Sequence, residues 1–177
     1  MLHKTNKLQF IFFAFFSALS ANSLAQAIVN IEDLRREGEV GFFTNISASL
    51  DAARGNRDRD YYSLQIRFDN NSENAESFLI LQQSERKSND ITMDESTFMH
   101  GRYILLGEER IHWEIFTQYS ENPFRNYKKR SVFGAGARYE LTNTMRVGAG
   151  FLGEDETDLS GKSKTTDRFG FYLHNDF

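Results

Sequence analysis

The side chains that could do chemistry are a few histidines with carboxylates and one serine. The candidate set consists of His100, His112 and His174 with Glu114, Asp176 or Ser63. Such residues can form an acid–base pair or a Ser-His-acid arrangement, as in outer-membrane lipid-modifying enzymes. One alternative is therefore a lipid-modifying enzyme that uses His100 or His112. No nucleophile elbow accompanies them. We therefore favour an inward-facing network of hydrogen bonds and ion pairs, and we expect no catalytic residue and no enzymatic activity. The predicted network comprises Arg67, His100, Arg102, His112, Glu114, Arg138, Arg146 and Arg168.

Two charged runs are the other candidates for binding. The acidic run Glu154–Asp158 could hold Ca²⁺ or bridge to lipopolysaccharide through divalent cations, but it lacks the ligand spacing of an EF-hand. The run Asn126–Arg130 could contact lipopolysaccharide phosphates. We favour a solvated loop for both. The chain has no Cys, which excludes disulfides and thiolate metal sites, and it has no P-loop, dinucleotide fingerprint or zinc spacing. We expect no metal and no cofactor.

Period-two alternation of apolar and polar residues must position these side chains. It predicts eight strands, mostly 8–11 residues long, and no convincing helix after residue 39. The segments are residues 40–50, 62–69, 77–83, 97–105, 111–119, 133–139, 145–151 and 168–174.

The predicted connections alternate in length. Those after the first, third, fifth and seventh strands are long and polar, those after the fourth and sixth are short, and that after the second is intermediate. Pro123, the single proline, falls in a long connection, where it interrupts no ladder. Short turns at one end and long charged loops at the other are typical of an outer-membrane barrel.

The N-terminal segment is predicted to be a signal peptide. Lys4 and Lys7 precede an apolar run, and the small-x-small pattern that ends at Ala27 is typical of a cleavage site. The alternative is an uncleaved anchor, for which the run is short. We expect a signal peptide over residues 1–27, a periplasmic lead-in of undecided structure over 28–38, and the barrel domain over 39–177.

Composition leaves two all-β classes open. The net charge of −4 argues against a broad nucleic-acid-binding face, and the mean hydropathy of −0.55 argues against a bundle of membrane-spanning helices. An alternative is a soluble periplasmic β-barrel that binds an apolar ligand, with Phe42, Leu64 and Ile115 buried inside. We favour a membrane barrel because the chain is exported, small glycines oppose large residues, and aromatic residues lie near strand ends on the apolar face. Those aromatics are Tyr61, Tyr62, Trp113, Tyr119, Tyr139 and Phe169.

Four stretches, residues 28–35, 98–103, 113–125 and 134–139, resemble in the same order a family of uncharacterised proteins called salt-induced outer membrane proteins. The resemblance implies an outer-membrane β-barrel and supplies no catalytic residues. Family members continue past the point that matches Phe177, so the chain is either a shortened member or a truncated one. Eight strands give a lumen that side chains fill, whereas ten or twelve leave room for small solutes.

The sequence therefore predicts an all-β, antiparallel up-and-down transmembrane barrel of about eight strands in the bacterial outer membrane. We expect a structural or osmotic-stress role with a polar lumen, or a small-solute channel if the full barrel has more strands. The expected partners are outer-membrane lipid and lipopolysaccharide, with the barrel-assembly machinery during biogenesis.

Overall fold

The computed structural model describes residues 40–107, 110–142 and 144–175. The predicted signal peptide, its cleavage site at Ala27 and the lead-in lie outside the described residues, as does Asp176.

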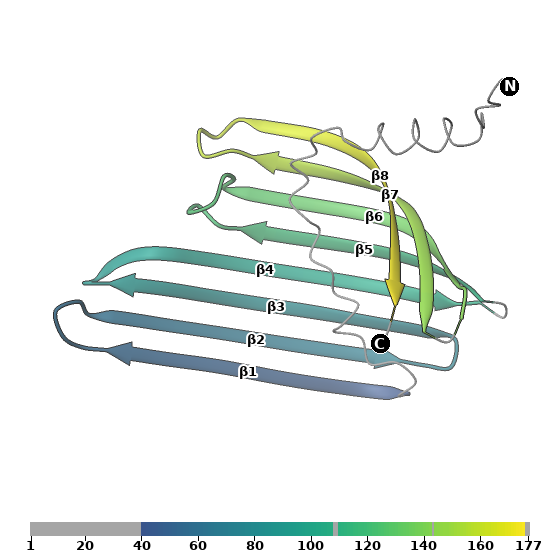
Figure 1. The fold of residues 1–177 in the computed structure, drawn as a ribbon, viewed down its shortest axis with the longest axis horizontal. Coiled ribbons are helices and arrows are strands. Elements are labelled where there is room, and N and C mark those ends of the chain that lie inside the picture. The colour runs from purple at the N-terminus through teal and green to yellow at the C-terminus, as the bar shows by residue number, and fades with distance from the viewer. Residues whose placement is uncertain (1–39, 108–109, 143, 176–177) are drawn as a thin grey trace, which may run out of the picture. The chain divides into compact units, whose positions relative to one another are not determined.

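The described residues form one eight-stranded antiparallel sheet with the strands in chain order, which confirms the predicted up-and-down arrangement of eight strands (Figure 1). The strands are β1 (Gly41–Ala53), β2 (Arg59–Asn71), β3 (Ala75–Ser88), β4 (Ile91–Leu106), β5 (Ile111–Glu121), β6 (Lys129–Glu140), β7 (Met145–Thr157) and β8 (Ser163–Asn175). Among the described residues, no helix has the length and hydropathy needed to cross a membrane.

The predicted long loop between the third and fourth strands is wrong. The two strands continue through it and meet at a two-residue turn, Asn89-Asp90, whose φ angles are 49° and 63°. Two consecutive positive φ angles are the geometry of a type I′ hairpin turn, which matches the twist of the strands beside it. Residues 84–88 are all polar and residues 91–96 contain only Ile91 and Met93 as apolar residues, so the alternation that reveals a half-buried strand is weak here.

The hairpins at one end of the sheet reach further than those at the other, and longer strands account for more of this difference than longer loops do. The connections from β2 to β3, from β4 to β5 and from β6 to β7 lie at one end, which we call the turn end. The hairpins at the opposite end, the extended end, are closed by residues 54–58, 89–90, 122–128 and 158–162, and the β1–β2 and β3–β4 hairpins reach furthest on the left of Figure 1. The predicted asymmetry is thus present, but strands supply much of it.

Within the described residues the sheet is curved and not closed. β1 pairs with β2 and β8 pairs with β7, and no pairing joins β1 to β8. Figure 1 shows β7 and β8 bending away from the direction of β1–β4. The structure therefore confirms the eight antiparallel up-and-down strands of the predicted barrel, and the described strands do not form a closed barrel.

The two faces of the sheet have opposite character. We call inner the face that carries Arg67, His100, Glu114, Arg138 and Glu154, each at most 8% exposed. We call outer the face that carries large apolar side chains, which are exposed: Phe42 67%, Ile46 65%, Trp113 60%, Phe151 71% and Phe171 75%. Charged side chains buried beside exposed aromatic ones reverse the usual arrangement of a soluble domain.

Candidate functional site: a charged inner face and an uncharged outer band

Arg67 and Asp69 form a bidentate ion pair at consecutive inward positions of β2. The Arg67 Nε donates to Asp69 Oδ2 at 2.8 Å, and Nη2 donates to Oδ1 at 2.5 Å. The guanidinium carbon also lies 4.9 Å from the centre of the Phe78 ring on β3. A buried charge is tolerated only when it is paired, and this fork geometry satisfies both partners.

Glu154 on β7 accepts hydrogen bonds from two arginines. Arg130 on β6 binds its Oε2 through Nε at 3.0 Å and also through Nη2, and Arg168 on β8 donates to its Oε1 at 2.8 Å. Tyr127, 6% exposed, lies under Arg130 with its ring centre 5.9 Å from the guanidinium carbon. The prediction that the runs 126–130 and 154–158 are solvated loops is therefore wrong for Arg130 and Glu154, because β6 and β7 extend over them and turn them inward. It is also wrong for Tyr127, which is buried in the connection before β6.

Two further pairs lie nearer the turn end. Arg102 on β4 donates to Oε2 of Glu114 on β5 at 3.4 Å. His112 Nδ1 accepts the backbone N–H of Gly107 at 3.3 Å, and His112 Nε2 lies 3.2 Å from Oε1 of Glu140. One neutral tautomer of His112, with the proton on Nε2, satisfies both contacts.

His100 is fully buried and surrounded by aromatic rings. The rings of Phe78, Phe98 and Phe116 stack with it at centroid distances of 5.8, 6.3 and 6.0 Å. In the described residues neither ring nitrogen of His100 meets the geometry of a hydrogen bond, and its register partner on β5 is Gln118. His100 therefore packs as a core residue of the inner face.

The structure places the predicted network on the inner face of β2 and β4–β8. Arg138 and Arg146 are 2% and 6% exposed, and Arg138 is the register partner of His112. Of the candidate catalytic set, Asp176 lies outside the described residues, and Ser63 and His100 do not lie side by side. Ser63 pairs with Ser84, four residues along β3 from Ile80, which is the partner of His100. The predicted network did not include Asp69, Arg130 or Glu154, although Asp69 stands two residues after Arg67 on the same strand face.

Large inner-face rings lie flat over glycines of the next strand. A Cβ added to Gly134 would meet Phe116 Cζ at 2.4 Å, and one added to Gly148 would meet Tyr172 Cε1 at 2.3 Å. Glycine at these positions leaves the room that the neighbouring ring occupies, which is the role the sequence predicted for small residues.

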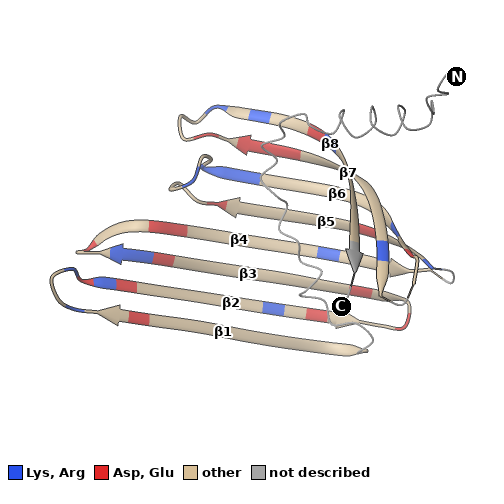
Figure 2. Ribbon diagram, in the orientation of Figure 1, with Lys and Arg blue, Asp and Glu red and all other residues tan. Residues whose placement is uncertain are grey.

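The outer face of β2–β7 carries a band without charged side chains, which we call the uncharged band. On each of these strands it comprises five successive outward positions. They lie between the turn end and the first outward charged residue. On β5 the band runs from Ile111 to Tyr119, and Glu121 follows it. Figure 2 shows charged residues at the extended end of β2, β3 and β4, at the start of β6 and at the end of β7. The outward charges that border the band are Asp60, Glu85, Glu95, Glu121, Lys129 and Asp155. Lys87 lies beyond Glu85 on β3, and Asp167 on β8 is opposite Gly153.

The band has the length that a membrane-spanning strand needs. Five outward positions take nine residues, or roughly 27 Å of strand at about 3.4 Å per residue. A tilted strand crosses the hydrocarbon layer in about 9–11 residues. Tyr62 and Tyr119 lie at the charged border of the band, and the Tyr119 hydroxyl donates to Glu121 at 2.8 Å. Tyr61, predicted to share this face, instead turns inward, where Arg86 lies 5.5 Å from its ring centre.

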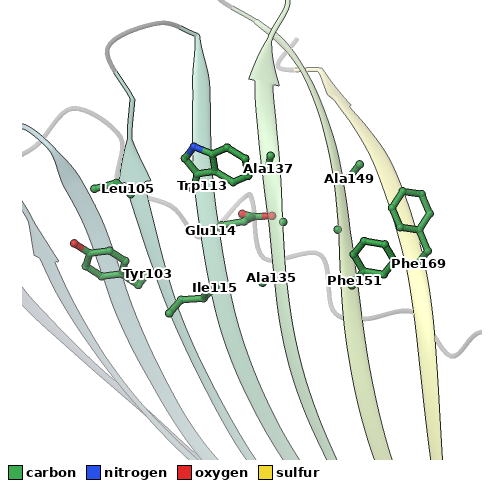
Figure 3. Close-up of a pocket in the computed structure, with 12 residues that line it drawn as sticks. Tyr103, Leu105, Trp113, Glu114, Ile115, Ala135, Ala137, Ala149, Phe151 and Phe169 are labelled. Atoms are coloured by element: carbon green, nitrogen blue, oxygen red, sulfur yellow. The ribbon is translucent and has the colours of Figure 1, made fainter.

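A shallow apolar groove of about 530 Å³ crosses the band over β4–β8 (Figure 3). Its floor consists of small residues on β6 and β7, and Trp113 and Phe151 flank it. Phe151 and Phe169 pack with ring centres 4.9 Å apart. Among the described residues no group of three or more His, Asp or Glu side chains is arranged to hold a metal ion.

One family matches the chain over residues 46–152, which is more than half of its length, and its description reads "Protein of unknown function, DUF481". The chain belongs to this family. The matched region begins within β1 and ends within β7, so most of the sheet described above is the part that the DUF481 family shares. The family description carries neither a function nor the salt-induced name that the sequence motifs suggested. No curated protein and no solved structure matches the chain.

Proposed function

We propose that this DUF481 protein is an integral outer-membrane β-barrel protein, non-enzymatic, that serves envelope integrity or adaptation to salt and osmotic stress. The observation that carries the proposal is the uncharged outer band, which continues across β2–β7 while the opposite face buries ion pairs. In a bilayer the band contacts lipid tails, and the inner face lines the lumen.

The border of the band supports its place at a membrane–water interface. Outward charges begin where the band meets the extended end, and Tyr62 and Tyr119 lie at that border, as expected at such an interface. The turn end would face the periplasm and the extended hairpins would face outward, where lipopolysaccharide is the partner. Export through the predicted signal peptide and insertion by the barrel-assembly machinery belong to the same proposal.

The soluble alternative fits the geometry less well. A carrier of apolar ligands needs its apolar face inside, but Phe42, Leu64 and Ile115 are 67%, 44% and 50% exposed. In the enzymatic alternative His100 must reach a substrate, whereas its ring is fully buried among three phenylalanines.

Membrane fractionation tests the proposal. Expressed with its leader in a Gram-negative host, the protein should sediment with the outer membrane, resist extraction by salt and carbonate, and migrate differently on gels before and after boiling. Release by the salt wash, together with equal mobility before and after boiling, would contradict it.

A further inference from the structure

Two shallow apolar grooves adjoin on the outer face of the sheet over β6–β8. The groove of Figure 3 shares Ala135, Phe151 and Phe169 with a second groove of about 550 Å³, which continues toward the extended end as far as Phe133 and Gly153. Both grooves cross the uncharged band, which the proposed function places against lipid tails. Together they offer one acyl chain a continuous apolar surface.

Ala135, where the two grooves meet, lies at the depth of one leaflet. It follows Lys129, the outward charge that borders the band on β6, by six positions on the same strand. Six residues span roughly 20 Å of strand at about 3.4 Å per residue. At a tilt of about 45° this is a depth of about 14 Å, close to half of the hydrocarbon layer of about 30 Å. An acyl chain in the second groove therefore belongs to the leaflet whose head groups lie at the extended end.

Basic side chains stand at that end of β6. Arg125, Lys128 and Lys129, which we call the basic cluster, are exposed, and none of them forms an ion pair with another described residue. The outward carboxylates beside the cluster, Glu121 on β5 and Asp155 on β7, accept hydrogen bonds from neighbouring hydroxyl groups instead. The basic cluster is therefore available to an anion, and Arg and Lys side chains bind phosphate groups well.

We infer that the grooves and the basic cluster bind one molecule of lipopolysaccharide in the outer leaflet, an inference that rests on the proposed function. One acyl chain lies over Ala135, and the basic cluster binds the phosphate groups of the head. Phosphate and acyl chain must occur in the same molecule because the cluster and the grooves lie along one strand, and the extended end faces the leaflet that holds lipopolysaccharide. The rest of the border is less suitable for a phosphate, since the first outward charges on β2–β5 are carboxylates: Asp60, Glu85, Glu95 and Glu121.

Retention of lipopolysaccharide by the purified protein tests the groove. The full-length protein is extracted from outer membranes in a mild detergent, and native mass spectrometry counts the lipopolysaccharide molecules left on each chain. We expect one on the wild type. Ala135→Leu fills the groove with a side chain that suits lipid, so retention should fall several-fold. Ala48→Leu adds the same volume to the outer face of β1, away from the grooves, and as the matched control should retain lipopolysaccharide as the wild type does.

A second pair of variants tests the basic cluster. Lys128→Gln combined with Lys129→Gln removes two of its charges and should also lower retention several-fold. Arg57→Gln combined with Arg59→Gln removes two charges from the β1–β2 hairpin, also at the extended end, and should leave retention unchanged. Equal retention by the two double variants would overturn the assignment of the phosphate groups to the basic cluster.

Trp113, the single tryptophan of the chain, flanks the groove and reports its occupant without any substitution. In vesicles of brominated phosphatidylcholine its fluorescence should be quenched, and small mole fractions of lipopolysaccharide should restore the fluorescence by displacing brominated chains. Recovery that merely follows the mole fraction of lipopolysaccharide would show that the groove has no preference for it, and would overturn the inference.

The outcomes separate this inference from the proposed function. Heat-modifiable protein in the outer membrane that retains no lipopolysaccharide, or retains phospholipid in its place, would overturn the inference and leave the proposed function standing. Protein found outside the membrane would overturn both.

Discussion

Asp58 and Asn89 exchange two hydrogen bonds between the tips of neighbouring hairpins. The Asp58 N–H donates to Oδ1 of Asn89 at 2.9 Å, and the Asn89 N–H donates to the Asp58 carbonyl oxygen at 2.9 Å. Asn89 also has a φ of 49°, a conformation that asparagine adopts more readily than most residues. Asn89 therefore has two roles: its backbone conformation closes the β3–β4 turn, and its side chain binds the β1–β2 turn.

We predict that Asn89→Gly and Asn89→Ala separate these two roles. Both substitutions remove the acceptor for the Asp58 amide, so its hydrogen exchange should speed up several-fold in each. Asn89→Ala also keeps a β-carbon in the left-handed region without the side-chain amide that lets asparagine tolerate it, so it should lower the stability of the hairpin by about 1 kcal/mol more than Asn89→Gly does. Unchanged exchange of the Asp58 amide in Asn89→Gly would show that the hairpin tips are not coupled through this side chain.

Glu154 and Asp155 are adjacent on β7 but face opposite sides of the sheet, which makes them a matched pair. Glu154→Gln removes the charge that two arginines share in a buried site, and we expect a loss of about 3 kcal/mol in the free energy of unfolding. Asp155→Asn alters an exposed contact, with the Thr165 hydroxyl, and should cost less than about 1 kcal/mol.

Urea unfolding of both variants in the same detergent measures this difference. Equal losses in the free energy of unfolding would mean that Glu154 stabilises the fold no more than the exposed Asp155 does. Adding Arg168→Gln to Glu154→Gln should recover part of the loss, because it removes one of the two guanidinium groups left without a charged partner.

The number, order and faces of the strands could be predicted because the apolar band makes every second residue informative. On β5, Ile111, Trp113 and Ile115 alternate with His112 and Glu114, and the structure keeps that alternation. Outside the band the signal weakens, since polar residues occupy most positions on both faces and only Ile91 and Met93 are apolar in the segments 84–88 and 91–96. The strand ends at residues 84–88 and 91–96 were missed for this reason.

The partners within the inner face could not be predicted from the sequence. Which carboxylate meets Arg130 depends on the register of β6 against β7, and period two fixes the face of a residue but not its neighbour across the sheet. The prediction that Tyr61 and Tyr62 share the apolar face is a different error, because neighbouring residues of a strand point to opposite faces, and β2 places Tyr62 outward and Tyr61 inward.

Asp158 organises the turn between β7 and β8. Its carboxylate accepts hydrogen bonds from the Ser160 hydroxyl, at 2.6 Å, and from the backbone amides of Lys162 and Ser160, and these bonds, the hydroxyl's first, lower its pKa. A lowered pKa in the folded turn means that the ionised form stabilises it. That contribution is fully present above the ordinary Asp pKa of about 3.9 and is lost as the pH falls through the lower, folded value.

We therefore predict that the turn stays ordered at pH 5 and loosens only in strong acid. The amide resonances of Ser160 and Lys162 should titrate together, with a midpoint below that of an unperturbed aspartate. Ser160→Ala should move that midpoint up toward the ordinary value, because it removes the strongest of the bonds. A midpoint that does not respond to Ser160→Ala would show that the hydroxyl does not hold the carboxylate.

If the outer band faces lipid, substitutions at Phe151 and Leu159 should have different effects on stability. Both are exposed apolar residues, at 71% and 59%. Phe151 lies within the band on β7, whereas Leu159 lies in the turn beyond it. In a bilayer Phe151→Arg places a charge in hydrocarbon, which costs about 2–4 kcal/mol at the midplane of a membrane barrel, whereas Leu159→Arg stays in water and costs less than about 0.5 kcal/mol. The amount of folded, heat-modifiable protein in the outer membrane and the urea midpoint in lipid vesicles report the difference. If the sheet were soluble, both arginines would point into water and both variants would match the wild type, so equal behaviour of the two would refute the membrane assignment.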